Sequence, residues 1–270
     1  MKLLSSILLI LILLLIITAN ELYSQSELDS PLEAFPVDRS SNYTGVFFGL
    51  GANFQTGEYQ PVCDNCLFDE ASGFGFTAGL ILNEQFLTNS IAIGGAAGID
   101  YMSQSGAYRS VEAIQYRNAE TNEILTKDGI MRYEAETSYM SFVFMPYIKW
   151  EPAEVFFFRV GFTGLIPISS EVYFTENPAQ NIIKDPDGTI YAVEADLTVI
   201  DDGEVEEVNS FLMYLNPAIG FNIDLANDIQ FSPIFQYNIP VSNISESGNN
   251  YQLHSWRIMF ELRIFSASIF

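Results

Sequence analysis

The chain has 270 residues and a formal net charge of −23 at pH 7, with 49% hydrophobic and 14% aromatic residues. A charge of this sign repels phosphate groups, which excludes general binding to nucleic acids or anionic lipids. The apolar and aromatic content excludes an intrinsically disordered acidic chain. High apolar content beside high net charge predicts that the two are segregated along the sequence.

Residues 1–25 have the layout of a secretory signal peptide. Lys2 gives a positive start, residues 3–18 form an apolar run broken only by serines, and a small, polar stretch follows. The run is short for a membrane-spanning helix, and an uncleaved anchor is the alternative. We expect export, with residues 26–42 as a short periplasmic segment before a folded domain at 43–270.

The only cysteines, Cys63 and Cys66, lie in the stretch "PVCDNCLF". In an exported protein such a close pair is typical of a small disulfide that pins a loop. A redox-active pair would need a helix N-terminus to lower the thiol pKa, and nothing nearby reads as a helix. A zinc site is disfavoured, because His254 is the only histidine.

Eight stretches of the chain alternate with the two-residue period of β-strands. One face of each stretch is apolar, and the other faces, taken together, are rich in glycine, alanine and serine with a few isolated charges. The stretches are TGVFFGLGANF (44–54), GFGFTAGLIL (73–82), SIAIGGAAGIDYM (90–102), YMSFVFMPYIKW (139–150), FFFRVGFTGLI (156–166), FLMYLNPAIGFNI (211–223), IQFSPIFQYNIPV (229–241) and SWRIMFELRIF (255–265).

Short and long connections alternate strictly between these stretches. If consecutive strands are antiparallel, every short turn lies at one end of the sheet and every long loop at the other. The turn signals "DPDG" (185–188) and "NAETN" (118–122) predict that two long loops project as β-hairpin arms. The arms lack a sustained apolar face, so we do not expect them to span a membrane. The short connections are 83–89, 151–154 and 224–228, and the long ones are 55–72, 103–137, 169–209 and 242–250.

The composition of the two faces predicts a membrane protein. A soluble sandwich or lipocalin-like barrel would bury its apolar face and cover the other with charges. Small residues on the non-apolar face instead fit the narrow interior of an eight-stranded barrel. The sequence therefore predicts an all-β fold, a transmembrane up-and-down antiparallel β-barrel of eight strands with short periplasmic turns and long outer loops. Aromatic residues near strand ends fit the interfacial girdles of such barrels: Tyr101, Trp150, Tyr237 and Trp256.

Strand length agrees with this prediction. Each apolar face supplies several outward residues, enough for the roughly 9–11 positions of a tilted strand that crosses a bilayer. Pro146, Pro217 and Pro233 lie inside the expected strands, and each lacks the N–H needed for a ladder hydrogen bond. We expect β-bulges or local kinks at these prolines.

The alternation, the loop asymmetry and the aromatic Phe270 together resemble the eight-stranded outer-membrane barrels. These are the membrane domain of OmpA, the OmpX type and the PorT-like "outer membrane protein β-barrel" family of Bacteroidota. The resemblance covers about residues 43–270 and includes no catalytic signature and no peptidoglycan-binding module. It implies the outer membrane of a diderm bacterium, both termini in the periplasm, surrounding outer-membrane lipid, and barrel-assembly machinery that reads Phe270.

The resemblance implies a scaffold with a structural, surface-contact or envelope-assembly role. A surface protein or ligand at the long loops is the expected partner. A narrow gated pore for small solutes is the first alternative, and a lipid-modifying enzyme is the second. Lipases and deacylases with this architecture place a histidine and a serine on one face, but Ser255 lies on the face opposite to His254. We therefore expect no catalysis and no cofactor.

Charged residues on the inward face are the candidate site. Because charges in a narrow interior must be paired, we expect Glu261 to bridge two basic groups. Removal of Glu261 is then expected to free Arg257 or Arg263 and to raise ion leak. A salt-bridged plug is preferred over a gate, because eight strands leave little free bore. The inward charges are Asp100, Lys149, Arg159, Arg257, Glu261 and Arg263.

The acidic stretch "DDGEVEE" (201–207) is the only metal candidate. Asp201, Asp202 and Glu204 offer carboxylate oxygens suited to Ca²⁺. The stretch does not match the twelve-residue Ca²⁺ loop, and acidic blocks usually repel one another and remain solvated. A solvated surface without metal is the preferred interpretation.

Overall fold

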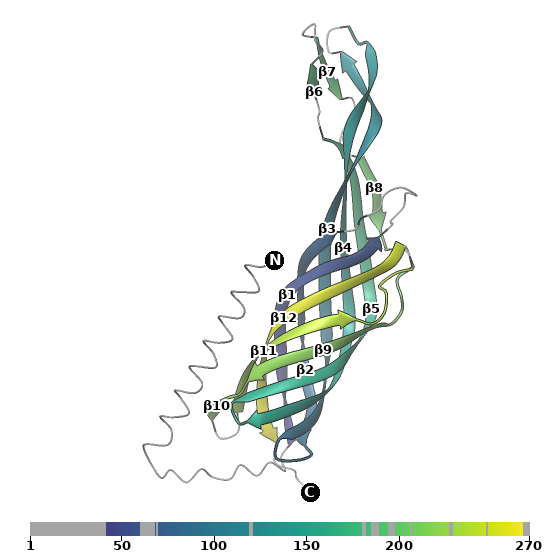
Figure 1. Cartoon of the computed structure of the whole chain (residues 1–270). Coiled ribbons are helices and arrows are strands. Elements are labelled where there is room, and N and C mark those ends of the chain that lie inside the picture. Colours follow the sequence, from purple (N-terminus) through teal and green to yellow (C-terminus); the bar gives the residue numbers. More distant parts are fainter. Residues whose placement is uncertain are drawn as a thin grey trace. The chain divides into compact units, whose positions relative to one another are not determined.

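The computed structural model describes residues 42–59, 68, 70–118, 121–179, 182–184, 189–193, 198–205, 207–226, 229–246 and 248–266. This part of the chain is built from β-strands (Figure 1), and none of it is a helix with the length and apolar content needed to span a membrane. The strands are β1 (Asn42–Tyr59), β2 (Ala71–Phe86), β3 (Ile91–Asn118), β4 (Ile124–Ala153), β5 (Phe156–Pro178), β6 (Ile182–Lys184), β7 (Ile190–Val193), β8 (Thr198–Gly203), β9 (Leu212–Phe221), β10 (Ile223–Ala226), β11 (Ile229–Pro240) and β12 (Gly248–Ser266).

Eight of the described strands close into a ring. Going round, each of β1, β2, β3, β4, β5, β9, β11 and β12 pairs antiparallel with the next, and β12 pairs back with β1. Closure runs from Asn42↔Ser266 to Tyr59↔Gly248. It gives hydrogen-bond partners to the backbone N–H and C=O groups that the edge strands of an open sheet would leave unpaired. The predicted eight-stranded barrel is confirmed.

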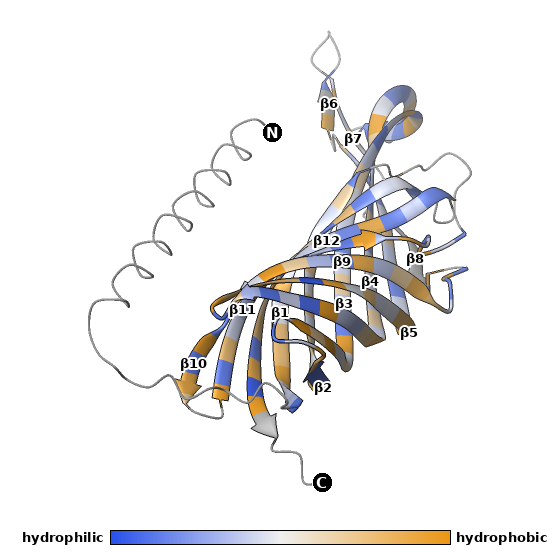
Figure 2. Ribbon diagram, turned by 60° about the horizontal axis from the view of Figure 1, so that its bottom comes forward, coloured by the Kyte–Doolittle hydropathy of each residue, from blue (hydrophilic) through white to orange (hydrophobic). Residues whose placement is uncertain are grey.

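Hydrophobic and hydrophilic residues alternate along the strands of the barrel wall (Figure 2), and the burial of their side chains shows which face each occupies. On β4, Phe142 and Ile148 are 59% and 58% exposed, whereas the residues just before them, Ser141 and Tyr147, are buried. Because strand side chains alternate, Phe142, Phe144 and Ile148 all point away from the barrel interior. A belt of exposed apolar side chains matches the hydrocarbon of a bilayer rather than water.

Two predicted hairpins extend the sheet beyond the barrel. β3 and β4 stay in register from Ile91↔Trp150 to Arg117↔Ile124, so the "NAETN" turn closes one long hairpin. β6 and β7 pair on either side of "DPDG", whose own residues lie outside the described part. β7 also pairs with the end of β3 (Figure 1). We call residues 107–134 together with β6 and β7 the arm.

The expected bulges at the strand prolines are wrong. Pro146, Pro217 and Pro233 all pair in register, with Gly95, Val160 and Phe260 respectively. A backbone N–H points to one neighbouring strand only, so a proline weakens the ladder on one side without inserting a residue. The pairing gaps lie on the other side: β4–β5 skips Pro146, and β9–β11 skips Pro217.

Register shifts occur elsewhere, and two of them extend strands into the expected turns. β2 shifts between Ile81 and Asn83 and continues to Phe86, through the stretch assigned to a turn. β4 shifts after Trp150 and continues to Ala153. Both extensions place additional side chains at the short-turn end of the barrel, where the candidate site lies.

Candidate functional site

All six charged residues assigned to the inward face lie inside the barrel, and each side chain is less than 8% exposed. They come from β3, β4, β5 and β12. Because a buried charge without a partner is costly, their partners decide what the interior can do. They fall into two groups. Lys149, Arg159, Glu261 and Arg263 lie together, and Arg257 and Asp100 lie farther from the short-turn end.

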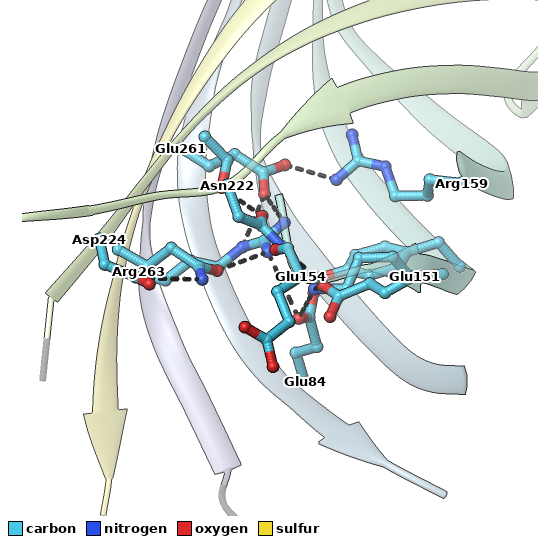
Figure 3. A network of polar contacts seen from close by, with 12 residues as sticks. Glu84, Glu151, Glu154, Arg159, Asn222, Asp224, Glu261 and Arg263 are labelled. Atoms are coloured by element: carbon cyan, nitrogen blue, oxygen red, sulfur yellow. Dashed lines mark hydrogen bonds and ion pairs between the residues drawn. The ribbon is translucent and has the colours of Figure 1, made fainter. Parts of the chain in front are cut away.

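The first group forms a six-membered ion-pair network with two further residues (Figure 3). Lys149 Nζ lies 2.7 Å from Glu151 Oε1 and also contacts Glu84. Arg263 Nε donates to Glu261 Oε2 at 3.0 Å, and its guanidinium reaches Glu84 at 3.5 Å. Arg159 contacts the other oxygen of Glu261. We call this network the ionic cluster; its members are Glu84, Lys149, Glu151, Arg159, Glu261 and Arg263.

The charges of the ionic cluster balance, with three carboxylates against three basic groups. Aromatic rings fill the space around it. Lys149 Nζ lies 5.2 Å and the Arg263 guanidinium carbon 5.3 Å from the ring centre of the buried Phe157. The Arg159 guanidinium carbon lies 4.7 Å from the ring of Tyr147. Contacts of this kind stabilise a desolvated cation and leave little room for water.

Sequence reasoning missed two members of the ionic cluster, Glu84 and Glu151. Both were assigned to short turns. The register shift between Ile81 and Asn83 reverses the alternation, so that Glu84 points inward although Leu80 and Leu82 point outward. Glu151 lies two residues beyond Lys149 on the same face. Its position follows from the unbroken alternation of β4.

Gly94 makes room for one side chain of this region. A Cβ atom at residue 94 would lie 2.5 Å from Cζ and 2.6 Å from the hydroxyl oxygen of Tyr147. That hydroxyl donates a 2.8 Å hydrogen bond to Glu84. The absence of a side chain at 94 therefore lets β4 place its tyrosine against the ionic cluster.

Gly94→Val is expected to push the Tyr147 ring away and to destabilise the barrel by about 1–3 kcal/mol, the usual cost of overpacking. The measurement is urea unfolding of the protein in lipid vesicles. Gly95→Val is the matched control, because nothing lies within 4 Å of a Cβ atom at that position. Equal losses in the two variants would contradict this role of Gly94.

The second group does not join the ionic cluster. Arg257 donates to Asn53 Oδ1 at 2.9 Å and to the carbonyl of Trp256 at 3.2 Å. Among the described residues no carboxylate forms an ion pair with it. Of the two arginines offered as partners of Glu261, Arg263 is the one that pairs with it, and Arg257 is not. Four residues of extended strand separate Arg257 from Glu261 by ~13 Å, whereas Arg263 is two residues away on the same face.

An aromatic cluster fills the outer end of the barrel. The rings of Tyr59 and Tyr251 stack at 4.9 Å, and the hydroxyls of Tyr251 and Tyr139 lie 3.1 Å apart. Phe68 and Phe174 pack edge to face at 5.8 Å. We call this cluster the aromatic cap; its members are Tyr59, Phe68, Tyr108, Tyr133, Tyr139, Phe174 and Tyr251.

Most of the aromatic cap comes from stretches that the sequence assigned to long loops. Tyr133 also joins the two long strands of the arm, because its hydroxyl on β4 donates a 2.7 Å hydrogen bond to Glu112 on β3. Burial and the adjacent Glu112 carboxylate raise the pKa of Tyr133 above its usual value, which keeps it protonated as a donor. The barrel interior is thus filled near both ends.

None of the remaining candidates is a described side chain of this interior. Cys63, Cys66 and Phe270 are outside the described residues. Asp201 and Asp202 belong to β8, but their side chains are also outside that part, and Glu204 is exposed. The described residues contain no group of three or more histidine, cysteine, aspartate or glutamate side chains arranged to hold a metal ion.

The single histidine lies on the outward face. His254 is partly exposed, and its Nδ1 lies 3.3 Å from the hydroxyl of Tyr237 on the neighbouring strand. Ser255 is buried on the inward face and accepts a hydrogen bond from Asn238 at 2.7 Å. The two side chains therefore point to opposite sides of the barrel wall.

Comparisons with known proteins concern architecture alone. No family profile and no curated protein sequence matches the chain. Among solved structures, it is similar to the attachment invasion locus protein Ail of Yersinia pestis, with a TM-score of 0.33, 8% identity, and 83% of this chain and 99% of that chain covered. For Neisserial surface protein A the values are 0.28, 9%, 82% and 97%. For the outer membrane protease OmpT of Escherichia coli they are 0.32, 8%, 88% and 100%.

Similarities at this level carry no argument about activity, ligand or partner. The fold rests on the chain's own geometry, a closed ring of eight antiparallel strands with an apolar outer surface. This is the architecture of the outer-membrane β-barrels.

Proposed function

We propose that the chain is a non-conducting outer-membrane β-barrel that presents the arm for contacts with surface or envelope-assembly partners. The observation that carries this proposal is the filled interior, closed near the short turns by the ionic cluster and near the outer end by the aromatic cap. An eight-stranded barrel is only wide enough for side chains to fill it. The cavity beside Tyr147 and Arg159 measures about 10 Å³, room for about one water molecule.

The arm supports the interaction part of the proposal. Within the described residues, every basic side chain outside the barrel interior lies on the arm: Arg109, Arg117, Lys127, Arg132 and Lys184. The rest of the outer end is acidic or neutral, so the arm offers partners a region of mixed charge. An envelope-assembly role in the PorT manner, or an OmpA-like structural role, is the finer form of this proposal.

We propose no catalytic role and no cofactor. Ser255, the serine next to His254 in the chain, lies on the opposite face of the barrel wall, and no observation favours the lipid-modifying enzyme. Outer-membrane lipid around the apolar belt and barrel-assembly machinery acting on Phe270 are the proposed partners of insertion. Both termini are proposed to lie in the periplasm, because Asn42 and Ser266 pair at the short-turn end.

One observation favours a gated pore as the second candidate. Three hydroxyls between the ionic cluster and the aromatic cap are buried without a hydrogen-bond partner among the described residues, those of Ser141, Thr163 and Tyr214. Buried polar atoms are normally satisfied, so water is expected to reach them. Water in the middle of the barrel would become a path only if both closures opened.

Planar-bilayer recording separates the two candidates. The filled interior predicts no steady unit conductance from the purified, folded chain. Folding is verified independently by a shift in gel mobility between unheated and boiled samples. Steady conductance from the folded protein would reject the non-conducting scaffold and establish the pore.

A further inference from the structure

The barrel wall has a break at its outer end, between β5 and its neighbours. β5 pairs with β9 as far as Leu165↔Leu212 and with β8 from Val172↔Gly203 onward. Within the described residues, the segment 166–171 has no strand partner on that edge, although it remains paired with β4 on the other. β9 thus runs along the first part of β5, and β8 runs along its last part, near the outer end of the barrel (Figure 1).

The chain that precedes β9 turns away from β5 at this break. Val208 pairs with Ser245, and Asn209 N–H donates to the carbonyl of Ile244 at 2.8 Å. Both partners belong to the connection between β11 and β12. Pro167, which has no N–H to leave unsatisfied, lies within the unpaired part of β5. The break is therefore built into the strand arrangement.

A cavity of about 200 Å³ occupies the break. Among the described residues, its polar lining consists of three serine hydroxyls, one amide and one carboxylate, without a basic side chain. Such a lining donates to and accepts from hydroxyl groups, but it has no cation to hold a phosphate. The polar residues are Ser169, Ser170, Glu204, Asn209 and Ser210.

The outer surface beside the cavity is apolar. Ile166, Ile168 and Phe211 are each more than half exposed. The Phe211 ring lies over Gly164, where a Cβ atom would come within 2.9 Å of the ring. A polar cavity and an apolar surface thus adjoin at the outer end of the barrel wall. Together they match an amphipathic molecule that lies in the outer leaflet.

We propose that this break binds the headgroup of a neutral glycolipid, with its acyl chains against Ile166, Ile168 and Phe211. Sugar hydroxyls suit the serine, amide and carboxylate lining, and the unpaired backbone of β5 adds further donors and acceptors. The Glu204 carboxylate disfavours phosphate headgroups by repulsion. The proposal rests on the proposed membrane location of the barrel and assigns it a lipid ligand.

Native mass spectrometry of the full chain released from phosphatidylcholine nanodiscs tests this proposal. The nanodiscs contain equal small amounts of monogalactosyl diacylglycerol and phosphatidylglycerol with identical acyl chains. We expect preferential retention of the galactolipid. Ser210→Tyr, which fills the cavity, and Glu204→Gln, which removes the carboxylate, are each expected to lower that retention about tenfold, the scale of one or two lost hydrogen bonds.

The matched controls lie away from the cavity. Ser105→Tyr changes an exposed serine of β3, and Glu123→Gln changes an exposed glutamate of the arm; both should retain the galactolipid. Equal retention of the two lipids, unchanged retention in Ser210→Tyr and Glu204→Gln, or equal binding of free methyl galactoside would overturn the glycolipid site. Failure of the chain to fold into nanodiscs, seen as no shift in gel mobility, would instead contradict the membrane location.

Discussion

Replacing Glu261 with alanine is expected to destabilise the barrel by roughly 3–5 kcal/mol, the usual cost of removing one partner from a buried ion pair. Glu261 is 2% exposed, and its two carboxylate oxygens contact different arginines, Arg159 and Arg263. Its removal leaves the ionic cluster with three bases and two carboxylates. Urea unfolding in lipid vesicles, followed by tryptophan fluorescence, measures the change.

Glu134→Ala is the matched control, because Glu134 also pairs with an arginine, Arg132, but both side chains are exposed. An exposed pair is worth about 0–1 kcal/mol, so this variant should unfold close to the unaltered protein. Double variants sharpen the test. Arg263→Met combined with Glu261→Ala should be non-additive, whereas Arg257→Met should add independently. Equal losses for Glu261→Ala and Glu134→Ala would reject the ionic cluster as a stabilising element.

The inward charges could be predicted because the side-chain period of a strand is two. Once Trp256 and Ile258 are placed outside, Arg257, Glu261 and Arg263 must point inside, whatever the rest of the fold. Continuing the same phase from Lys149 by two residues would have added Glu151. Glu84 could not be found in this way, because a one-residue register shift moves every following side chain to the opposite face.

The aromatic cap could not be predicted from periodicity. Tyr59, Tyr139 and Tyr251 meet from β1, β4 and β12, and their contacts depend on how the end of β1 and the start of β12 lie against the middle of β4. The arm was predictable for the opposite reason, since a turn signal such as "DPDG" acts locally. The predicted bulges at Pro146, Pro217 and Pro233 were wrong because a proline removes one hydrogen bond from the ladder without changing the register of the strand.

Tyr251→Ala is expected to open the outer end of the barrel with a loss of about 3–5 kcal/mol, as for other buried aromatic truncations. The side chain is fully buried, stacks on Tyr59 and shares a hydrogen bond with Tyr139. Tyr251→Phe keeps the ring and should lose only about 1 kcal/mol. Limited trypsin digestion measures this opening at the outer end, because trypsin cleaves after arginine and Arg109 lies on the adjoining arm. Cleavage there should accelerate in Tyr251→Ala.

Tyr173→Ala is the control for this variant, because Tyr173 is 40% exposed on β5. Conductance then tests whether the two closures act in series. With the aromatic cap intact, Glu261→Ala alone should remain non-conducting, which replaces the expectation that this change by itself raises leak. Tyr251→Ala should also remain closed, since the ionic cluster is unaltered. Only the double variant should leak. Conductance from either single variant would mean that the other cluster does not seal the barrel.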